Sequence, residues 1–152
     1  MRVFIIAKSK RHTRIYHYFN KAFQRLGHHT YWIKYLKLKS YLGDRMATAL
    51  VNGLMRLTKP DLLFFHGRDI SLGLLQKAKK RMPVAMYFDD CIRGSRRSFN
   101  TIVEQGRQAD IMYLTNRGEI AEYRKHGVNA RFITGGCDPA AGSRLGKDES
   151  IR

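Results

Sequence analysis

The amino-acid sequence predicts an α/β fold built on a doubly wound parallel sheet of about six strands, with helices on both faces. Two observations lead to this prediction. Short β-branched or aromatic runs alternate along the chain with longer stretches of helical period. The strand runs are continuously apolar, which is typical of parallel strands that are covered on both faces. Right-handed crossovers then place the helices on both sides of one sheet.

The first half of the chain predicts two strands and two helices. Residues 3–7 are apolar and predict a buried strand, and residues 31–33 predict a second one. Between them, apolar residues recur on one helix face: Ile15, Phe19, Ala22, Phe23 and Leu26. Gly27 follows where a left-handed helix cap is needed. A second helical stripe comes next, and Pro60 prevents that helix from continuing: Met46, Leu50, Leu54 and Leu57.

The same alternation continues in the second half. We expect strands at 62–65, 84–88, 111–114 and 131–133, separated by helices around 70–82, 99–103 and 116–126. Pro83 can open a strand because its missing N–H is tolerated at the first position. Asn116 with Glu119 resembles a reciprocal helix cap, and Gly127 ends that helix. After residue 135 the chain turns small and polar, so we expect one domain over 1–139 and a linker or disordered tail over 140–152.

Composition limits the classes of protein that fit. The 152 residues include 43% apolar residues, enough to bury a core, and two cysteines, too few for a disulfide scaffold. No apolar run approaches the roughly 20 residues that cross a bilayer, and the N-terminal run lacks the features of a signal peptide. We therefore expect a cytoplasmic protein. Its 29 lysines and arginines against 12 acidic residues give a net charge of +17, which favours a polyanionic partner.

Candidate site residues come from the carboxyl ends of the strands, where an open parallel sheet binds its ligands. These ends offer positive charge and polar groups for an anion: Lys8, Lys10, Arg11, Arg68, Arg93 and Asn116. The loop after the first strand has no glycine, so it does not match a dinucleotide-binding or phosphate-binding loop. Neither cysteine has partners at metal-ligand spacing, and we predict no metal site and no bound cofactor.

Three side chains at these strand ends are candidates for acid–base chemistry: His66, Asp89 and Asp90. Histidine has an ordinary pKa of about 6.5. Neighbouring strand residues point to opposite faces, so at most one of the two aspartates enters a given pocket. The alternative is structural: one aspartate caps the next helix or pairs with an arginine such as Arg93, and His66 is a satisfied polar residue. Both interpretations stay open at this point.

The first 43 residues contain no acidic side chain, and aromatic residues are interleaved with their basic ones: Tyr16, Tyr18, Tyr31, Trp32, Tyr35 and Tyr41. Bases stack on aromatic rings in single-strand binders, so a non-enzymatic basic module that binds nucleic acid or an anionic membrane surface is the alternative function. Against it, several of these aromatics fit a core role, and no nucleic-acid recognition motif is present.

Several segments, in this order, resemble the N-terminal domain of GT-B glycosyltransferases. The segments are 25–30 (RLGHHT), 59–67 (KPDLLFFHG), 109–116 (ADIMYLTN), 123–128 (YRKHGV) and 132–139 (FITGGCDP). The last is most similar to the family 4-like, spore-maturation-type branch. The resemblance spans about residues 2–139. It implies a Rossmann-like fold and the acceptor-binding half of an enzyme that transfers a sugar from a nucleotide-sugar donor.

By this resemblance the donor is bound mainly by a C-terminal Rossmann-like domain, so we expect a truncated, lone N-terminal domain that is inactive by itself. The basic residues at the strand ends favour an anionic acceptor for such a domain, such as a phosphorylated glycan or a lipid carrier, and a peripheral location at the inner membrane face. An exposed inter-domain face would also allow self-association. The sequence departs from the family in two places. Residues 8–11 stand where related retaining enzymes often have a glycine-rich loop. Some members have a histidine–aspartate pair after the fourth strand, and here only Asp90 matches it, so the stereochemical outcome of the transfer, retention or inversion, stays open.

Overall fold

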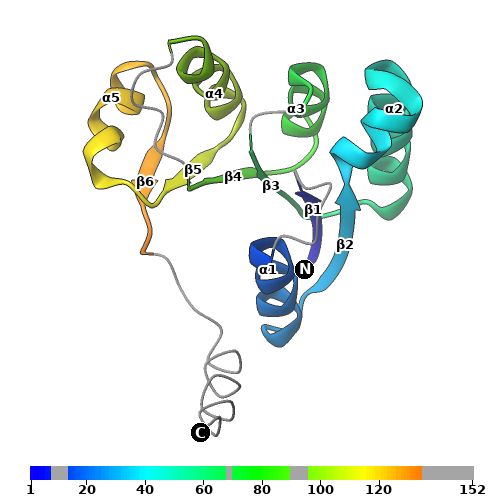
Figure 1. Ribbon diagram of the computed structural model, residues 1–152. Coiled ribbons are helices and arrows are strands. Elements are labelled where there is room, and N and C mark those ends of the chain that lie inside the picture. Colours follow the sequence, from blue (N-terminus) through cyan, green and yellow to red (C-terminus); the bar gives the residue numbers. More distant parts are fainter. Residues whose placement is uncertain (8–13, 68–69, 90–95, 135–152) are drawn as a thin grey trace, which may run out of the picture.

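The computed structural model describes residues 1–7, 14–67, 70–89 and 96–134, and it contains one six-stranded sheet in which all neighbouring strands are parallel (Figure 1). The order across the sheet is β2-β1-β3-β4-β5-β6. The strands are β1 (Arg2–Ala7), β2 (His29–Lys34), β3 (Leu62–His66), β4 (Val84–Phe88), β5 (Ile111–Leu114) and β6 (Ala130–Phe132). The predicted fold class and all six predicted strands are confirmed.

The helices lie on both faces of the sheet, but in unequal numbers. They are α1 (Arg14–Arg25), α2 (Tyr35–Thr58), α3 (Leu72–Lys79), α4 (Arg96–Gln108) and α5 (Ile120–Lys125), with a 3-10 turn η1 (Arg117–Glu119) before α5. The connection from β1 to β2 runs toward one sheet edge, and every later connection runs toward the other. Because such crossovers are right-handed, α1 lies on one face and α2–α5 lie on the opposite face (Figure 1).

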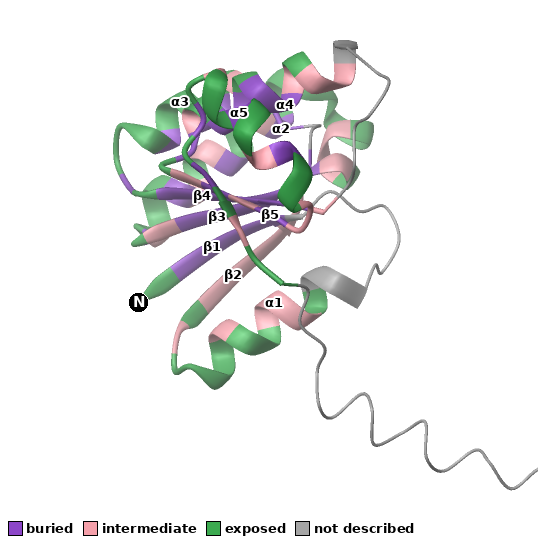
Figure 2. Cartoon of the chain, turned by 90° about the vertical axis from the view of Figure 1, so that its left-hand side faces the viewer, coloured by how far each residue is buried: buried purple, intermediate pink, exposed green. Residues whose placement is uncertain are grey.

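The two faces carry two separate hydrophobic clusters. Between them, buried residues predominate along the central strands β1, β3 and β4 (Figure 2). The larger cluster fills the space between the sheet and α2–α5. The smaller one, on what we call the α1 face, contains Phe64 of β3 and Tyr87 of β4. The Phe19 ring of α1 packs on both, with ring centroids 4.8 and 4.7 Å away. Leu26, which the sequence pattern placed on the inner side of this helix, is instead 70% exposed, because α1 ends at Arg25.

The same glycine cap ends α1 and α5. Gly27 and Gly127 have φ angles of 77° and 78°, in the left-handed region where a side chain would be strained. After α1, the His28 N–H donates to the Phe23 carbonyl and the Gly27 N–H to the Gln24 carbonyl. This is the Schellman arrangement, which pairs the last carbonyl groups of a helix. Both glycine caps were predicted, and both turn the chain directly into the next strand.

Helix α2 confirms the predicted helix, but a different face of it is buried. Its buried side chains are Tyr35, Ala47, Val51 and Met55. Met46, Leu50 and Leu57 of the predicted stripe are 64%, 44% and 80% exposed. The sequence carries apolar residues at helical spacing on two adjoining faces, so periodicity alone could not select between them. Packing against the sheet selects the face that contains Val51.

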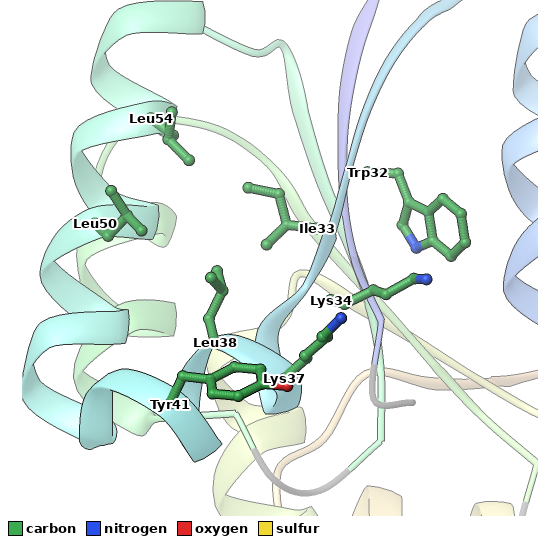
Figure 3. Close-up of a pocket in the computed structure, with 8 residues that line it drawn as sticks. All are labelled: Trp32, Ile33, Lys34, Lys37, Leu38, Tyr41, Leu50 and Leu54. Carbon is green, nitrogen blue, oxygen red and sulfur yellow. The ribbon is translucent and has the colours of Figure 1, made fainter. Parts of the chain in front are cut away.

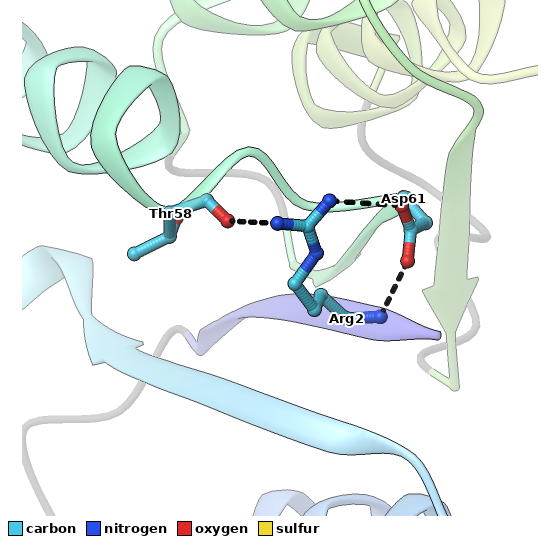
Figure 4. A network of polar contacts seen from close by, with 3 residues as sticks. All are labelled: Arg2, Thr58 and Asp61. Atoms are coloured by element: carbon cyan, nitrogen blue, oxygen red, sulfur yellow. Dashed lines mark hydrogen bonds and ion pairs between the residues drawn. The ribbon is translucent and has the colours of Figure 1, made fainter.

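A network at the amino ends of the strands joins β1 to the end of α2 (Figure 4). The Arg2 backbone N–H donates to the Asp61 carboxylate at 2.7 Å, and the Arg2 guanidinium donates to the Thr58 carbonyl at 3.3 Å and lies 3.5 Å from the same carboxylate. The bond from the Arg2 backbone, helped by the guanidinium charge, lowers the pKa of Asp61. This network lies at the opposite edge of the sheet from the strand ends discussed next.

Candidate functional site

A histidine and an aspartate meet at the carboxyl ends of β3 and β4. His66 is the last residue of β3, and Asp89 directly follows β4. The register pairs His66 with Tyr87, and Asp89 is two residues beyond Tyr87, so it lies on the same face of the sheet as His66. The Nε2 atom of His66 lies 2.6 Å from Oδ1 of Asp89. Two candidate acid–base residues, 23 positions apart in sequence, are therefore in direct hydrogen-bond contact.

The surroundings of this pair are partly apolar. The side chain of His66 is 9% exposed and that of Asp89 is 30% exposed, so the pair is shielded on the histidine side and open on the aspartate side. The Tyr87 ring lies 5.5 Å from the His66 ring, centroid to centroid, and packs on Phe19 of α1. Burial, and then the negative charge of Asp89, raises the pKa of the Tyr87 phenol. The pair therefore lies at the margin of the α1-face cluster, with one open side.

The backbone around Asp89 is tied to the next strand. The hydroxyl of Thr115, just after β5, donates to the Asp89 carbonyl at 3.3 Å. Asn116 accepts a hydrogen bond from the Gly118 N–H at 3.0 Å and so begins the turn η1. This bond confirms the asparagine side of the predicted cap with Glu119, and it gives Asn116 a local structural role at the same sheet edge.

A histidine–carboxylate contact of this kind supports base chemistry. A carboxylate that accepts the Nε2 proton fixes the tautomer and ring orientation of the imidazole, and it stabilises the imidazolium that forms when Nδ1 takes a proton. The partial burial of His66 strengthens that electrostatic effect, because little water screens it. The arrangement can therefore accept a proton from a hydroxyl group placed within hydrogen-bond distance.

The position of the pair agrees with where open α/β sheets bind ligands. Strands β1 and β3 are neighbours, but the connection after β1 leaves toward one edge and the connection after β3 toward the other. Ligands bind at such a switch point, beyond the carboxyl ends of the strands. His66 ends β3, one of the two strands that form it. The pair thus lies beside the switch point and on the α1 face.

Other predicted site residues lie outside the described part of the chain: Lys8, Lys10, Arg11, Arg68, Asp90 and Arg93. Tyr87 and Thr115 were not predicted as site residues. Tyr87 is two residues before Asp89, so its position on the same face followed from strand alternation once the register with β3 was known. No sequence pattern predicted Thr115, because its hydrogen bond to Asp89 depends on how close together the carboxyl ends of β4 and β5 lie.

The aromatic residues that suggested nucleic-acid stacking do not share one environment. Tyr35 is fully buried in the core, Tyr31 and Trp32 are half-buried in the edge strand β2, and Tyr41 is 75% exposed. The buried position of Tyr35 agrees with the structural interpretation of these aromatics. Within residues 1–7, 14–67, 70–89 and 96–134, no three His, Cys, Asp or Glu side chains come together as a metal site would need.

No protein-family model and no curated protein matches this chain. In the parts that the structure describes, none of the helices combines the length and the apolar character needed to span a membrane.

Proposed function

We propose that this chain is the acceptor-binding half of a glycosyltransferase, in which the pair of His66 and Asp89 removes a proton from an acceptor hydroxyl. The observation that carries the proposal is the 2.6 Å contact between these side chains at the carboxyl edge of a doubly wound parallel sheet. The resemblance of residues 2–139 to GT-B glycosyltransferases supports the same class. The nucleotide-sugar donor is then bound mainly by a second Rossmann-like domain.

The roles of the two residues follow from the chemistry of their side chains. His66 is the base, since an imidazole held by a carboxylate can accept a proton from a hydroxyl group, and Asp89 orients the ring and offsets its charge. An acceptor approaches from the open side, beside Asp89. The basic residues of the neighbouring strand ends, such as Lys10 and Arg68, attract an anionic group on that acceptor. The expected acceptor is therefore a hydroxyl-bearing, phosphorylated glycan or lipid carrier.

The test has a binding arm and a turnover arm. Binding of the chain to neutral and phosphorylated glycans is measured on an array. We expect selective binding to the phosphorylated glycans, and an excess of a neutral glycan should not reduce it. Turnover is measured as nucleoside diphosphate release from a panel of nucleotide sugars, with the chain joined to a GT-B donor-binding domain. Without glycan selectivity, or without release from any donor, the glycosyltransferase assignment is wrong.

A matched pair of variants tests the base. His66→Gln is expected to lower turnover by roughly 100-fold or more while leaving acceptor binding within a few-fold, because general-base removal acts on the chemical step. His126→Gln is the control, since His126 also lies beside a carboxylate, 3.3 Å from Glu122, but directly after α5 and away from the strand ends. Equal turnover in the two variants would show that His66 is not the base, even if the chain is a glycosyltransferase.

A further inference from the structure

We propose that the exposed face of α2, together with the groove between α2 and β2, is a docking surface for an anionic lipid bilayer. The face consists of Met46, Leu50, Gly53 and Leu57, which we call the α2 stripe. This proposal stands apart from the acid–base site, because it uses the opposite face of the sheet and the edge strand β2. It holds or fails independently of glycosyl transfer.

The α2 stripe is continuous along the helix. At 3.6 residues per turn, its four positions fall within about 60° of one another around the helix axis, over roughly three turns. Met46 and Leu57 are among the most exposed large apolar side chains of the described residues. A Cβ atom added at Gly53 would meet nothing within 4 Å, so the surface is open between them. Such a stripe on the outside of a helix is typical of interfacial helices.

The groove next to the stripe is also apolar. It holds about 420 Å³ and is lined mainly by side chains of β2 and α2. Figure 3 shows Leu50 and Leu54 of α2 on the same side of β2 as Ile33, with Leu38 and Tyr41 at the lower end. The volume lies within the range of sites that hold small apolar ligands. A segment of an acyl chain would fill it without burying a charge.

Cations surround both features. The ammonium group of Lys37 lies 5.9 Å from the Tyr41 ring at the groove. That of Lys34 lies 5.2 Å from the Trp32 ring, which borders the groove from the other side of β2 (Figure 3). Arg45 and Arg56 are exposed on the same helix, to one side of the stripe. Apolar side chains flanked by lysine, arginine and aromatic rings match the boundary between acyl chains and anionic headgroups.

Charge and shape together select the bilayer over other occupants. A second copy of this chain would place the same four cations against one another. A nucleic acid would satisfy the cations but would leave the α2 stripe in water. The stripe protrudes from the exposed face of a helix, a shape that suits insertion among the acyl chains of a bilayer. Of these three occupants, the anionic bilayer satisfies both the charge and the exposed apolar area.

The experiment is flotation of the full chain with vesicles of phosphatidylcholine alone or mixed with phosphatidylglycerol. We expect binding to the mixed vesicles only. Met46→Ser/Leu57→Ser is expected to weaken that binding roughly tenfold or more, since two exposed side chains no longer insert. Leu26→Ser is the matched control, because Leu26 is equally exposed but lies at the end of α1. Gly53→Leu adds apolar area to the stripe and is expected to strengthen binding.

The headgroup contact is tested in the same assay. Lys37→Gln is expected to weaken binding roughly fivefold, as for one basic residue near an anionic surface, and Lys125→Gln on α5 serves as its control. The proposal is wrong if the mixed vesicles are not bound or if Leu26→Ser and the stripe variant lose binding equally. It is also wrong if light scattering detects a dimer and the Met46→Ser/Leu57→Ser variant is monomeric, because the stripe then mediates self-association. Binding of single-stranded RNA, together with unchanged vesicle binding by that variant, contradicts it as well. If Gly53→Leu does not strengthen vesicle binding, the proposal is also wrong, and this test applies even where the double variant is unstable.

Discussion

The hydroxyl oxygen of Tyr35 lies 2.9 Å from Oγ1 of Thr48, across a break in α2. The break is at Gly43, whose φ of 74° and ψ of 168° are not helical. The Tyr35 hydroxyl also donates to the Asp44 carboxylate at 3.2 Å, just after the break. A fully buried ring from the first residue of the helix therefore anchors the start of its second part. This contact holds the segment that carries the α2 stripe.

The first prediction concerns this anchor. Tyr35→Phe keeps the buried ring and removes the hydroxyl, so we expect the free energy of unfolding to fall by about 1 kcal/mol, a usual value for a lost hydrogen bond. Tyr41→Phe is the control, since Tyr41 is 75% exposed, and its change should stay within about 0.5 kcal/mol. Urea unfolding measures both. Equal stability of the two variants would mean that the Tyr35 hydroxyl does not anchor the helix.

The second prediction compares two helical glycines. A Cβ atom at Gly106 of α4 would lie 2.9 Å from Val128 Cγ1 and 3.1 Å from the Met112 sulfur, inside the core. We expect Gly106→Ala to destabilise the protein, because overpacking costs roughly 1–3 kcal/mol. Gly53→Ala meets open space and should stabilise it by about 0.5–1 kcal/mol through helix propensity. Thermal unfolding measures both variants, and a Gly106→Ala variant as stable as Gly53→Ala would contradict the packing at Gly106.

The third prediction concerns acid stability. The pKa of Asp61 is lowered in the folded chain, chiefly by the bond from the Arg2 N–H. Below the ordinary aspartate pKa the unfolded chain therefore binds a proton that the folded chain does not, and stability falls as the pH falls. Asp61→Asn should be less stable than the unchanged chain at pH 7, and the difference should shrink toward pH 3. Urea unfolding across this range measures it, and a constant difference would contradict the linkage.

The fourth prediction tests the site without an activity assay. The pKa of the Tyr87 phenol is raised by burial and, to a smaller extent, by the charge of Asp89. Asp89→Asn removes that charge and should lower the pKa of Tyr87, while Asp61→Asn at the opposite sheet edge should leave it unchanged. NMR of tyrosine labelled at Cζ follows the ionisation through alkaline pH. An unchanged Tyr87 titration in Asp89→Asn would mean that Asp89 does not face this ring.

At the site, the sequence predicted the candidate residues but not the contact between them. The candidates His66 and Asp89 followed from strand ends, because parallel strands all end at one edge. Their direct contact did not follow, since it needs β3 beside β4 and the register that pairs His66 with Tyr87. No local pattern carries that register, which depends on how the whole sheet packs.

The sequence by itself determined the elements of this protein: six apolar strands, the helices between them, the glycine caps at 27 and 127 and the end of α2 before Pro60. These depend on local propensity, periodicity and backbone freedom, which neighbouring residues decide. Only the tertiary structure decided which face of α2 is buried and that α1 alone, among the described helices, covers its side of the sheet. Both outcomes depend on contacts between segments far apart in the chain, where two adjoining apolar faces compete for one core.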